Sequence, residues 1–163
     1  MPGLRVPLLL AMLAAVCVSA QRDIRVERIV PRKQIALVIG NGAYVNVGKL
    51  KNPVNDAESM ARQLRELNYD VLLVEEASRR QMGGKIDEFI GRLGNGDVAL
   101  FYYAGHGVQL DGENYLIPVD FEGNSESDVR YDAFAVGKLE DRMERSGAWD
   151  VHRVRNGAEQ CCK

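Results

Sequence analysis

Residues 97–109 read DVALFYYAGHGVQ, and this stretch decides the fold. Val98 to Tyr103 is an apolar, β-prone run that predicts a buried strand. The run ends in a small-residue turn that carries His106 between Gly105 and Gly107. Open α/β sheets present catalytic groups at the carboxyl ends of their strands, where glycine lets backbone approach closely. The stretch therefore predicts a strand that delivers one imidazole to such an edge.

The residues on either side of this stretch repeat a strand–helix pattern. Apolar runs at 35–39 and 69–74 predict two further strands. Apolar stripes predict one helix that begins at Pro53 and another that is capped by Ser78. This alternation is typical of right-handed parallel βαβ units. Beyond His106, residues 108–117 predict a β-hairpin, and residues 128–145 predict one more helix.

The segment after Gly147 departs from this pattern. Alternation requires a fourth parallel strand, but residues 149–157 (WDVHRVRNG) place isolated apolar residues among charged ones. A central strand buried on both faces cannot be built from such a segment. We therefore expect the sheet to be incomplete at its C-terminal end, and we treat residues 148–163 as an atypical tail.

The N-terminal residues have the composition of a targeting segment. Arg5 is the only charged side chain among the first twenty residues, residues 8–18 are apolar, and small residues precede Gln21. This pattern predicts a signal peptide over residues 1–20, cleaved near Ala20, and export to the periplasm or the medium. A lipid anchor at Cys17 is the alternative. The apolar run is too short for a stable membrane span, and residues 21–33 form a charged leader before a domain at 34–147.

Composition limits the remaining functions. The 163 residues suit one domain, and 21 Lys+Arg against 23 Asp+Glu give no support for a nucleic-acid partner. The turn at Gly40 and Gly42 lacks the third glycine and the immediate helix of a dinucleotide site. Cys161 and Cys162 are adjacent and rarely bridge each other, so no internal disulfide framework is expected. They could pair with other chains or stay free.

Four stretches carry a specific resemblance: residues 36–44 (ALVIGNGAY), 50–57 (LKNPVNDA), 102–109 (YYAGHGVQ) and 114–120 (NYLIPVD). In this order and spacing they resemble the bacterial caspase-like peptidases, the metacaspase-related branch of the caspase family (peptidase family C14). The match covers residues 33–147 and corresponds to the large-subunit (p20) region. It implies an α/β fold, a three-layer sandwich with a mainly parallel central sheet, and cysteine-type endopeptidase activity on polypeptide substrates.

The resemblance also implies roles for individual residues. His106 matches the general base, and the Gly107 N–H would donate to the oxyanion; a structural histidine bonded to backbone is the alternative. Asp56 matches an acid of the S1 pocket, which implies Arg or Lys at P1, while a first-turn carboxylate favoured by the helix dipole explains it equally well. Ala104 stands where many relatives carry a serine, so that polar contact of the substrate pocket is missing.

One further feature concerns calcium. Asp120, Glu122, Glu126 and Asp128 predict a solvated acidic loop; a calcium-responsive surface, as in some metacaspases, is the alternative, and no other metal or cofactor is expected.

The family places its cysteine in an Asp-Ala-Cys-Arg-like motif after an aliphatic strand, and no such motif follows residue 145. Cys161 and Cys162 follow a polar run instead, so neither is expected to be the nucleophile. A reading-frame change or truncation near Gly147 would explain the switch. We therefore expect this chain to be inactive. A non-catalytic pseudo-peptidase that binds a peptide or a partner protein at an open sheet edge is the alternative.

Overall fold

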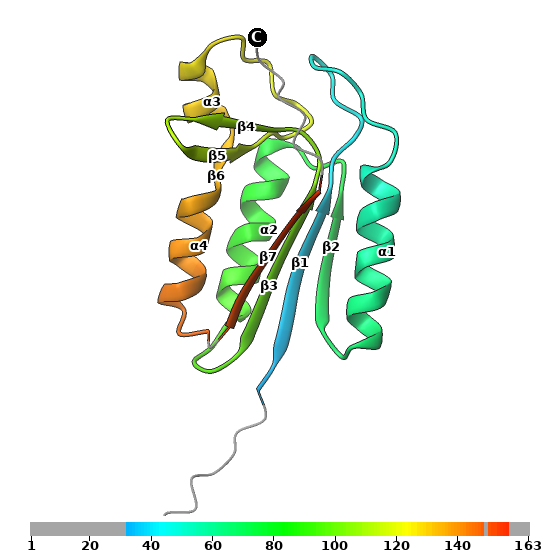
Figure 1. Ribbon diagram of the computed structural model, residues 1–163, viewed down its shortest axis with the longest axis vertical. Helices are drawn as coiled ribbons and strands as arrows, with labels where there is room; N and C mark the ends of the chain where they lie inside the picture. The colour runs from blue at the N-terminus through cyan, green and yellow to red at the C-terminus, as the bar shows by residue number, and fades with distance from the viewer. Residues whose placement is uncertain (1–31, 149, 157–163) are drawn as a thin grey trace, which may run out of the picture. The chain divides into compact units, whose positions relative to one another are not determined.

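The computed structural model describes residues 32–148 and 150–156. The predicted signal peptide, Cys17, Cys161 and Cys162 lie outside these residues. Strands and helices alternate along the described chain (Figure 1). In chain order they are β1 (Gln34–Gly40), α1 (Pro53–Glu66), β2 (Asp70–Glu75), α2 (Arg79–Arg92), β3 (Val98–Ala104), β4 (Gly107–Leu110), β5 (Glu113–Leu116), α3 (Glu126–Asp132), β6 (Phe134–Ala135), α4 (Val136–Arg145) and β7 (Asp150–Asn156).

The main sheet has four strands in the order β2-β1-β3-β7, and every pair of neighbours is parallel. Alternate residues of β1 supply two different apolar clusters. Ile35, Leu37 and Ile39 pack with residues of α2 and α4, whereas Ala36 and Val38 pack with residues of α1. A strand with apolar side chains on both faces has to be covered on both faces. The uninterrupted aliphatic run of β1 is therefore explained by its central place in the sheet.

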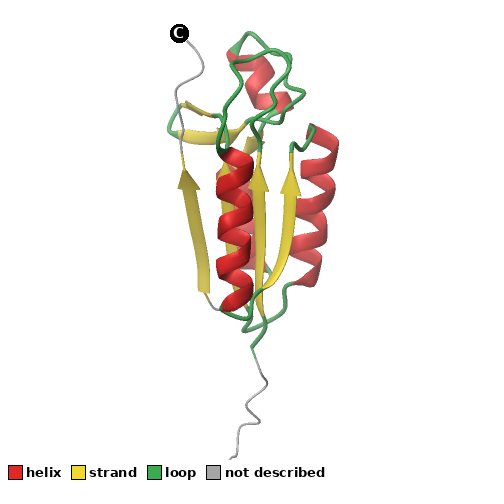
Figure 2. Ribbon diagram, turned by 90° about the vertical axis from the view of Figure 1, so that its right-hand side faces the viewer, coloured by secondary structure: helices red, strands yellow, loops and turns green. Residues whose placement is uncertain are grey.

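Helices cover both faces of this sheet. Figures 1 and 2 show α1 on one face and α2 with α4 on the other. Ala57 and Ala61 bring α1 close to the strands, and Met82 and Phe89 fill the opposite layer. The predicted α/β sandwich with a parallel central sheet is confirmed. No helix within the described residues is long and apolar enough to cross a membrane.

A second, antiparallel sheet in the order β4-β5-β6 follows His106 in the chain. Its β4–β5 hairpin was predicted, but the single helix predicted over 128–145 is wrong. Two helices occupy that range, because β6 pairs with β5 and breaks the helical hydrogen bonding between them. A capping box between Ser125 and Asp128 starts α3. The helix ends at Asp132, because the backbone of Ala133 is already extended. Helical periodicity alone did not reveal this interruption.

The prediction that residues 149–157 supply no fourth strand is also wrong. β7 pairs in parallel with β3 along its whole length, from Val98↔Asp150 to Ala104↔Asn156. That prediction took the segment as a central strand buried on both faces. β7 lies instead at the end of the strand order, where only one side needs a hydrogen-bonded neighbour. An edge strand tolerates charged residues, and natural sheets often place them there.

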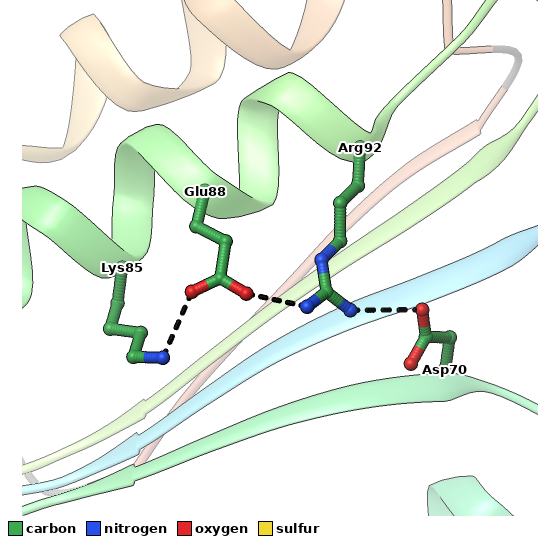
Figure 3. A network of polar contacts seen from close by, with 4 residues as sticks. All are labelled: Asp70, Lys85, Glu88 and Arg92. Atoms are coloured by element: carbon green, nitrogen blue, oxygen red, sulfur yellow. Dashed lines mark hydrogen bonds and ion pairs between the residues drawn. The ribbon is translucent and has the colours of Figure 1, made fainter.

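Charged side chains tie α2 to the start of β2 (Figure 3). Glu88 accepts from Lys85 Nζ at 2.9 Å and also pairs with Arg92, whose other terminal nitrogen is 3.1 Å from an Asp70 carboxylate oxygen. The hydrogen bond from Lys85, followed by that from Arg92, lowers the pKa of Glu88 below its ordinary value. These groups are solvated, so the network aligns the helix on the sheet and contributes little stability.

Candidate active site

The carboxyl ends of β1 and β3 place the candidate site at one edge of the main sheet. The two strands are parallel, and Gly40 pairs with Ala104. The Asn41 N–H donates to the Ala104 carbonyl at 2.8 Å, which holds the two chain segments together just beyond the sheet. His106 follows Ala104 by two residues. The predicted delivery of this imidazole to the carboxyl edge is what the structure shows.

The His106 ring is held by a backbone carbonyl. The side chain is 4% exposed, and Nε2 lies 2.6 Å from the carbonyl oxygen of Gly48. A carbonyl oxygen can only accept, so Nε2 carries the proton in this contact. In the neutral ring the basic lone pair then belongs to Nδ1. The contact therefore fixes which ring nitrogen is available to act as a base.

Two buried tyrosines surround the main chain of His106. The His106 N–H donates to the Tyr44 hydroxyl at 2.7 Å, and the Tyr103 hydroxyl donates toward the His106 carbonyl at 3.0 Å. The ring of Tyr44 packs on the imidazole with a centroid distance of 4.6 Å and an interplanar angle of 52°. Burial, followed by the nearby Tyr44, raises the pKa of Tyr103 well above its ordinary value, so its hydroxyl stays neutral.

The glycines on either side of His106 have different tasks. A Cβ at Gly105 would lie 2.6 Å from the hydroxyl oxygens of both Tyr44 and Tyr103, so a side chain does not fit there. Ile117 N–H donates to the His106 carbonyl at 3.1 Å, which makes Gly107 and Leu116 a non-hydrogen-bonded pair of the antiparallel ladder. The Gly107 N–H therefore points away from β5, as a donor to an external oxygen must.

The loop that carries Gly48 is braced by Glu76. The Glu76 carboxylate accepts from the N–H groups of Gly42 at 2.9 Å and Ala43 at 2.7 Å, and its own N–H donates to the Gly40 carbonyl at 2.9 Å. Glu76 has a φ of 49°, a left-handed conformation that is uncommon outside glycine. Strain of this kind persists where the surrounding contacts fix it. Glu76 thus fixes the start of the loop whose Gly48 carbonyl binds the histidine.

Asp56 and Ala104 have different surroundings. Asp56 is exposed in the first turn of α1, and its N–H donates to the Asn52 carbonyl at 2.9 Å. The turn lies against the end of β1, because a Cβ at Gly40 would be 2.6 Å from the carbonyl oxygen of Pro53. Asp56 therefore lies at the same sheet edge as His106. Ala104 is 2% exposed and packs in the cluster between the sheet and α1.

Two acids of the predicted acidic loop, Asp120 and Asp128, accept hydrogen bonds at helix starts. Asp120 accepts from the Arg79 N–H at 2.7 Å, at the first residue of α2. Asp128 accepts from the Ser125 hydroxyl and from the N–H groups of Asn124 and Ser125, and these bonds lower the pKa of its carboxyl. In the part of the chain that the structure describes, no group of three or more His, Cys, Asp or Glu residues is arranged to hold a metal ion.

Sequence reasoning found the histidine and missed the groups that hold it. Tyr44 and Tyr103 lie within the quoted motifs, yet a buried tyrosine in a strand or after one looks like ordinary core. The partner at Gly48 is a main-chain oxygen and leaves no mark in the sequence. The roles predicted for His106, Gly107, Asp56 and Ala104 stay predictions, because geometry alone does not measure a reaction.

Comparison with known proteins agrees with this fold. Residues 33–149 match the model of the Peptidase C14 family, described as the caspase domain. The chain is 36% identical over 89 residues to mucosa-associated lymphoid tissue lymphoma translocation protein 1 of Homo sapiens, and equally to its homolog of Mus musculus. The alignment covers 55% of this chain but only 11% of each relative.

A solved structure shares the fold. The crystal structure of protein GSU0716 from Geobacter sulfurreducens superposes with a TM-score of 0.56 at 23% identity, over 76% of this chain and 48% of that one. This likeness shows the fold alone. The family match over residues 33–149 spans more than two thirds of the sequence. The chain belongs to the Peptidase C14 family and contains its caspase domain.

Proposed function

We propose that this domain is the large-subunit part of a cysteine endopeptidase of the metacaspase-related branch. In this proposal His106 is the general base, the Gly107 N–H donates to the oxyanion, and Asp56 selects Arg or Lys at P1. One observation carries the proposal: the 2.6 Å contact between His106 Nε2 and the Gly48 carbonyl assigns the basic lone pair to Nδ1. A structural histidine bonded to backbone would make the same contact, so the peptide assay below is what separates the two roles.

The proposed chemistry uses these groups in order. Nδ1 of His106 takes the proton of a cysteine thiol, and the sulfur attacks the scissile carbonyl carbon. The carbonyl π electrons move to oxygen, where the Gly107 N–H donates to the developing charge. The imidazolium then returns its proton to the leaving amine as the C–N bond breaks. Each residue therefore acts at an atom that changes charge during the reaction.

No residue of this chain is assigned as the cysteine that supplies the nucleophilic thiol. In the family it follows a strand that comes after the helical region of residues 126–145. Here β7 occupies that place in the chain and ends at Asn156, opposite Ala104 and at the same edge as His106. The Asp-Ala-Cys-Arg-like motif is absent from the sequence. We propose that the chain as it stands does not turn substrate over.

Asp56 is the proposed determinant of specificity. Its carboxylate is exposed in the first turn of α1, so a guanidinium or ammonium group can reach it without displacing other side chains. A bidentate Arg–carboxylate pair is stronger than a neutral hydrogen bond. Polypeptides with Arg or Lys at P1 are therefore the proposed substrates.

Peptide binding and hydrolysis test the proposal together. Peptides with Arg, Lys or norleucine at P1 are titrated against the mature chain, with and without calcium, by calorimetry and by release of a fluorogenic leaving group. We expect the basic peptides to bind more tightly, Asp56→Asn to weaken their binding roughly tenfold or more, and Glu58→Gln to serve as the matched control on the same helix. We expect no turnover.

Each other outcome is informative. Equal binding of the Arg and norleucine peptides would refute the role of Asp56, and no saturable binding of any peptide would refute the function itself. Turnover that is lost in His106→Ala would support the general base and overturn the proposed inactivity. Cys161→Ser and Cys162→Ser would then identify the thiol.

The pseudo-peptidase alternative relied on a free sheet edge at β3, left by a missing strand. β7 covers that edge of β3 but itself ends the strand order of the described sheet. The alternative therefore rests on β7 as the edge for strand addition. Export is a separate proposal that rests on the first twenty residues. The intact mass of the protein secreted by an expressing cell tests it, with cleavage after Ala20 as the expected result and a retained N-terminus as the contrary one.

A further inference from the structure

We infer that the hydroxyl groups of Tyr44 and Tyr103 form a positioning pair that fixes the main chain and ring of His106. The role of His106 as a base rests on the proposed function, but the positioning does not. Both tyrosines are buried, with exposed fractions of 0% and 1%, and their hydroxyl oxygens are 3.0 Å apart. The pair lies between the end of β3 and the loop that follows β1.

The direction of each hydrogen bond follows from the acceptors. Tyr103 Oη lies 2.8 Å from the Ile117 carbonyl and 3.0 Å from the His106 carbonyl. Carbonyl oxygens cannot donate, so the single Tyr103 hydroxyl proton is directed to them. Tyr103 Oη must then accept from the Tyr44 hydroxyl. Tyr44 Oη in turn accepts from the His106 N–H at 2.7 Å, so one directed chain begins and ends on the main chain around His106.

This chain joins segments that are far apart in the sequence. Tyr44 comes from the loop after β1, Tyr103 from β3, and Ile117 from the end of the β4–β5 hairpin. His106 therefore has both its N–H and its carbonyl tied to hydroxyl groups, while Nε2 is tied to Gly48. The ring of Tyr44 also packs on the imidazole face. Movement of the histidine would break contacts with all of these segments.

Packing alone does not explain the two hydroxyl groups. Phenylalanine would fill nearly the same volume, and a buried hydroxyl costs free energy unless it is hydrogen-bonded. Gly105 gives an independent indication, because its missing side chain leaves the space that both hydroxyl oxygens occupy. Burial raises the pKa of Tyr103 well above its ordinary value, so its hydroxyl keeps its proton throughout the pH range in which a histidine titrates.

Histidine NMR tests the inference without any activity assay. The sequence holds two histidines, His106 and His152, so a His152→Gln background leaves one labelled ring to observe. Tyr44→Phe and Tyr103→Phe are compared with Tyr69→Phe, a half-buried tyrosine that packs on the α1 side of the sheet. The readouts are the tautomer of His106, its titration, and solvent exchange of the Nε2–H proton.

We expect both site variants to speed this exchange by roughly tenfold, the loss expected for about one hydrogen bond, and to mix the two tautomers. Tyr69→Phe should match the parent protein. A folded Tyr44→Phe and a folded Tyr103→Phe that both keep the parent tautomer and titration would overturn the inference. If Tyr103→Phe fails to fold, Tyr44→Phe decides the question, because it removes only the bond to the His106 N–H and the donor to Tyr103.

The result is separable from that of the proposed function. A change of tautomer in these variants supports the positioning pair even if no peptide binds to the protein. Peptide binding with an unchanged tautomer would support the function and overturn the pair.

Discussion

Replacement of Gly105 by alanine probes the tightest contact around His106. The added Cβ would lie 2.6 Å from the hydroxyl oxygens of Tyr44 and Tyr103, and 2.8 Å from the Cζ atom of Tyr103. Real carbon atoms do not approach oxygen so closely, so at least one tyrosine ring has to move. Both rings are fully enclosed, which leaves them little room to do so.

The cost has two parts. Overpacking of a well-packed core typically costs about 1–3 kcal/mol, and a buried hydroxyl that loses its partner costs about 1–3 kcal/mol. Alanine also restricts the unfolded chain, which offsets about 0.4–1 kcal/mol. We expect the free energy of unfolding to fall by about 2–5 kcal/mol, a large share of the roughly 5–15 kcal/mol of a typical domain.

Urea unfolding followed by circular dichroism measures this change, with equal slopes required for a valid comparison. Gly84→Ala is the control, because that glycine is exposed within α2 and a Cβ there meets no atom within 4 Å. The control should gain about 0.5–1 kcal/mol. A Gly105→Ala variant within about 0.5 kcal/mol of the parent protein would refute the packing argument.

Three further predictions concern the frame around the site. Phe89→Ala empties a fully buried position between α2 and the sheet and should cost about 3–5 kcal/mol by urea unfolding; a loss below about 1 kcal/mol would mean that the layer is loosely packed. Ser78→Ala removes the hydroxyl that accepts from the Gln81 N–H in the α2 capping box, while the Ser78 N–H bond to the Gln81 side chain can remain. The change should lower stability by about 0.5–2 kcal/mol, with a thermal melt unchanged from the parent as the contrary result. Asp128 has a pKa below its ordinary value in the folded state, so its contribution is present above the unfolded pKa and is lost as the pH falls through the folded one. Asp128→Asn should therefore flatten the fall of stability in acid, and an acid titration that is identical in both proteins would contradict this.

The main sheet could be predicted because its central strands are continuous aliphatic runs in the sequence. The aliphatic runs of β1 and β3 have to be covered on both faces, which requires helices on each side, and the stripes of α1 and α2 supply them. The single helix predicted over 128–145 was wrong because a short strand, Phe134–Ala135, interrupts it and pairs with β5. Such pairing depends on a neighbour distant in the chain, which local periodicity does not register.

The same distinction applies to the candidate site. His106 could be found because the glycines on either side of it are unusual at the end of a strand. The groups that hold the histidine could not be found from the sequence. The Gly48 oxygen belongs to the main chain, and Glu76 binds the loop from a left-handed backbone conformation that is uncommon for glutamate. β7 was missed for another reason: a rule that holds for central strands was applied to an edge strand.

The anchoring of one imidazole by several separate segments has a consequence for small-molecule binding. The carbonyl that orients the ring comes from the loop after β1, whereas Ile117 directly follows the β4–β5 hairpin. A small molecule that wedged the hairpin away from this loop would misalign the ring without occupying the proposed peptide site. Such a compound and a peptide would therefore bind at different places on the protein.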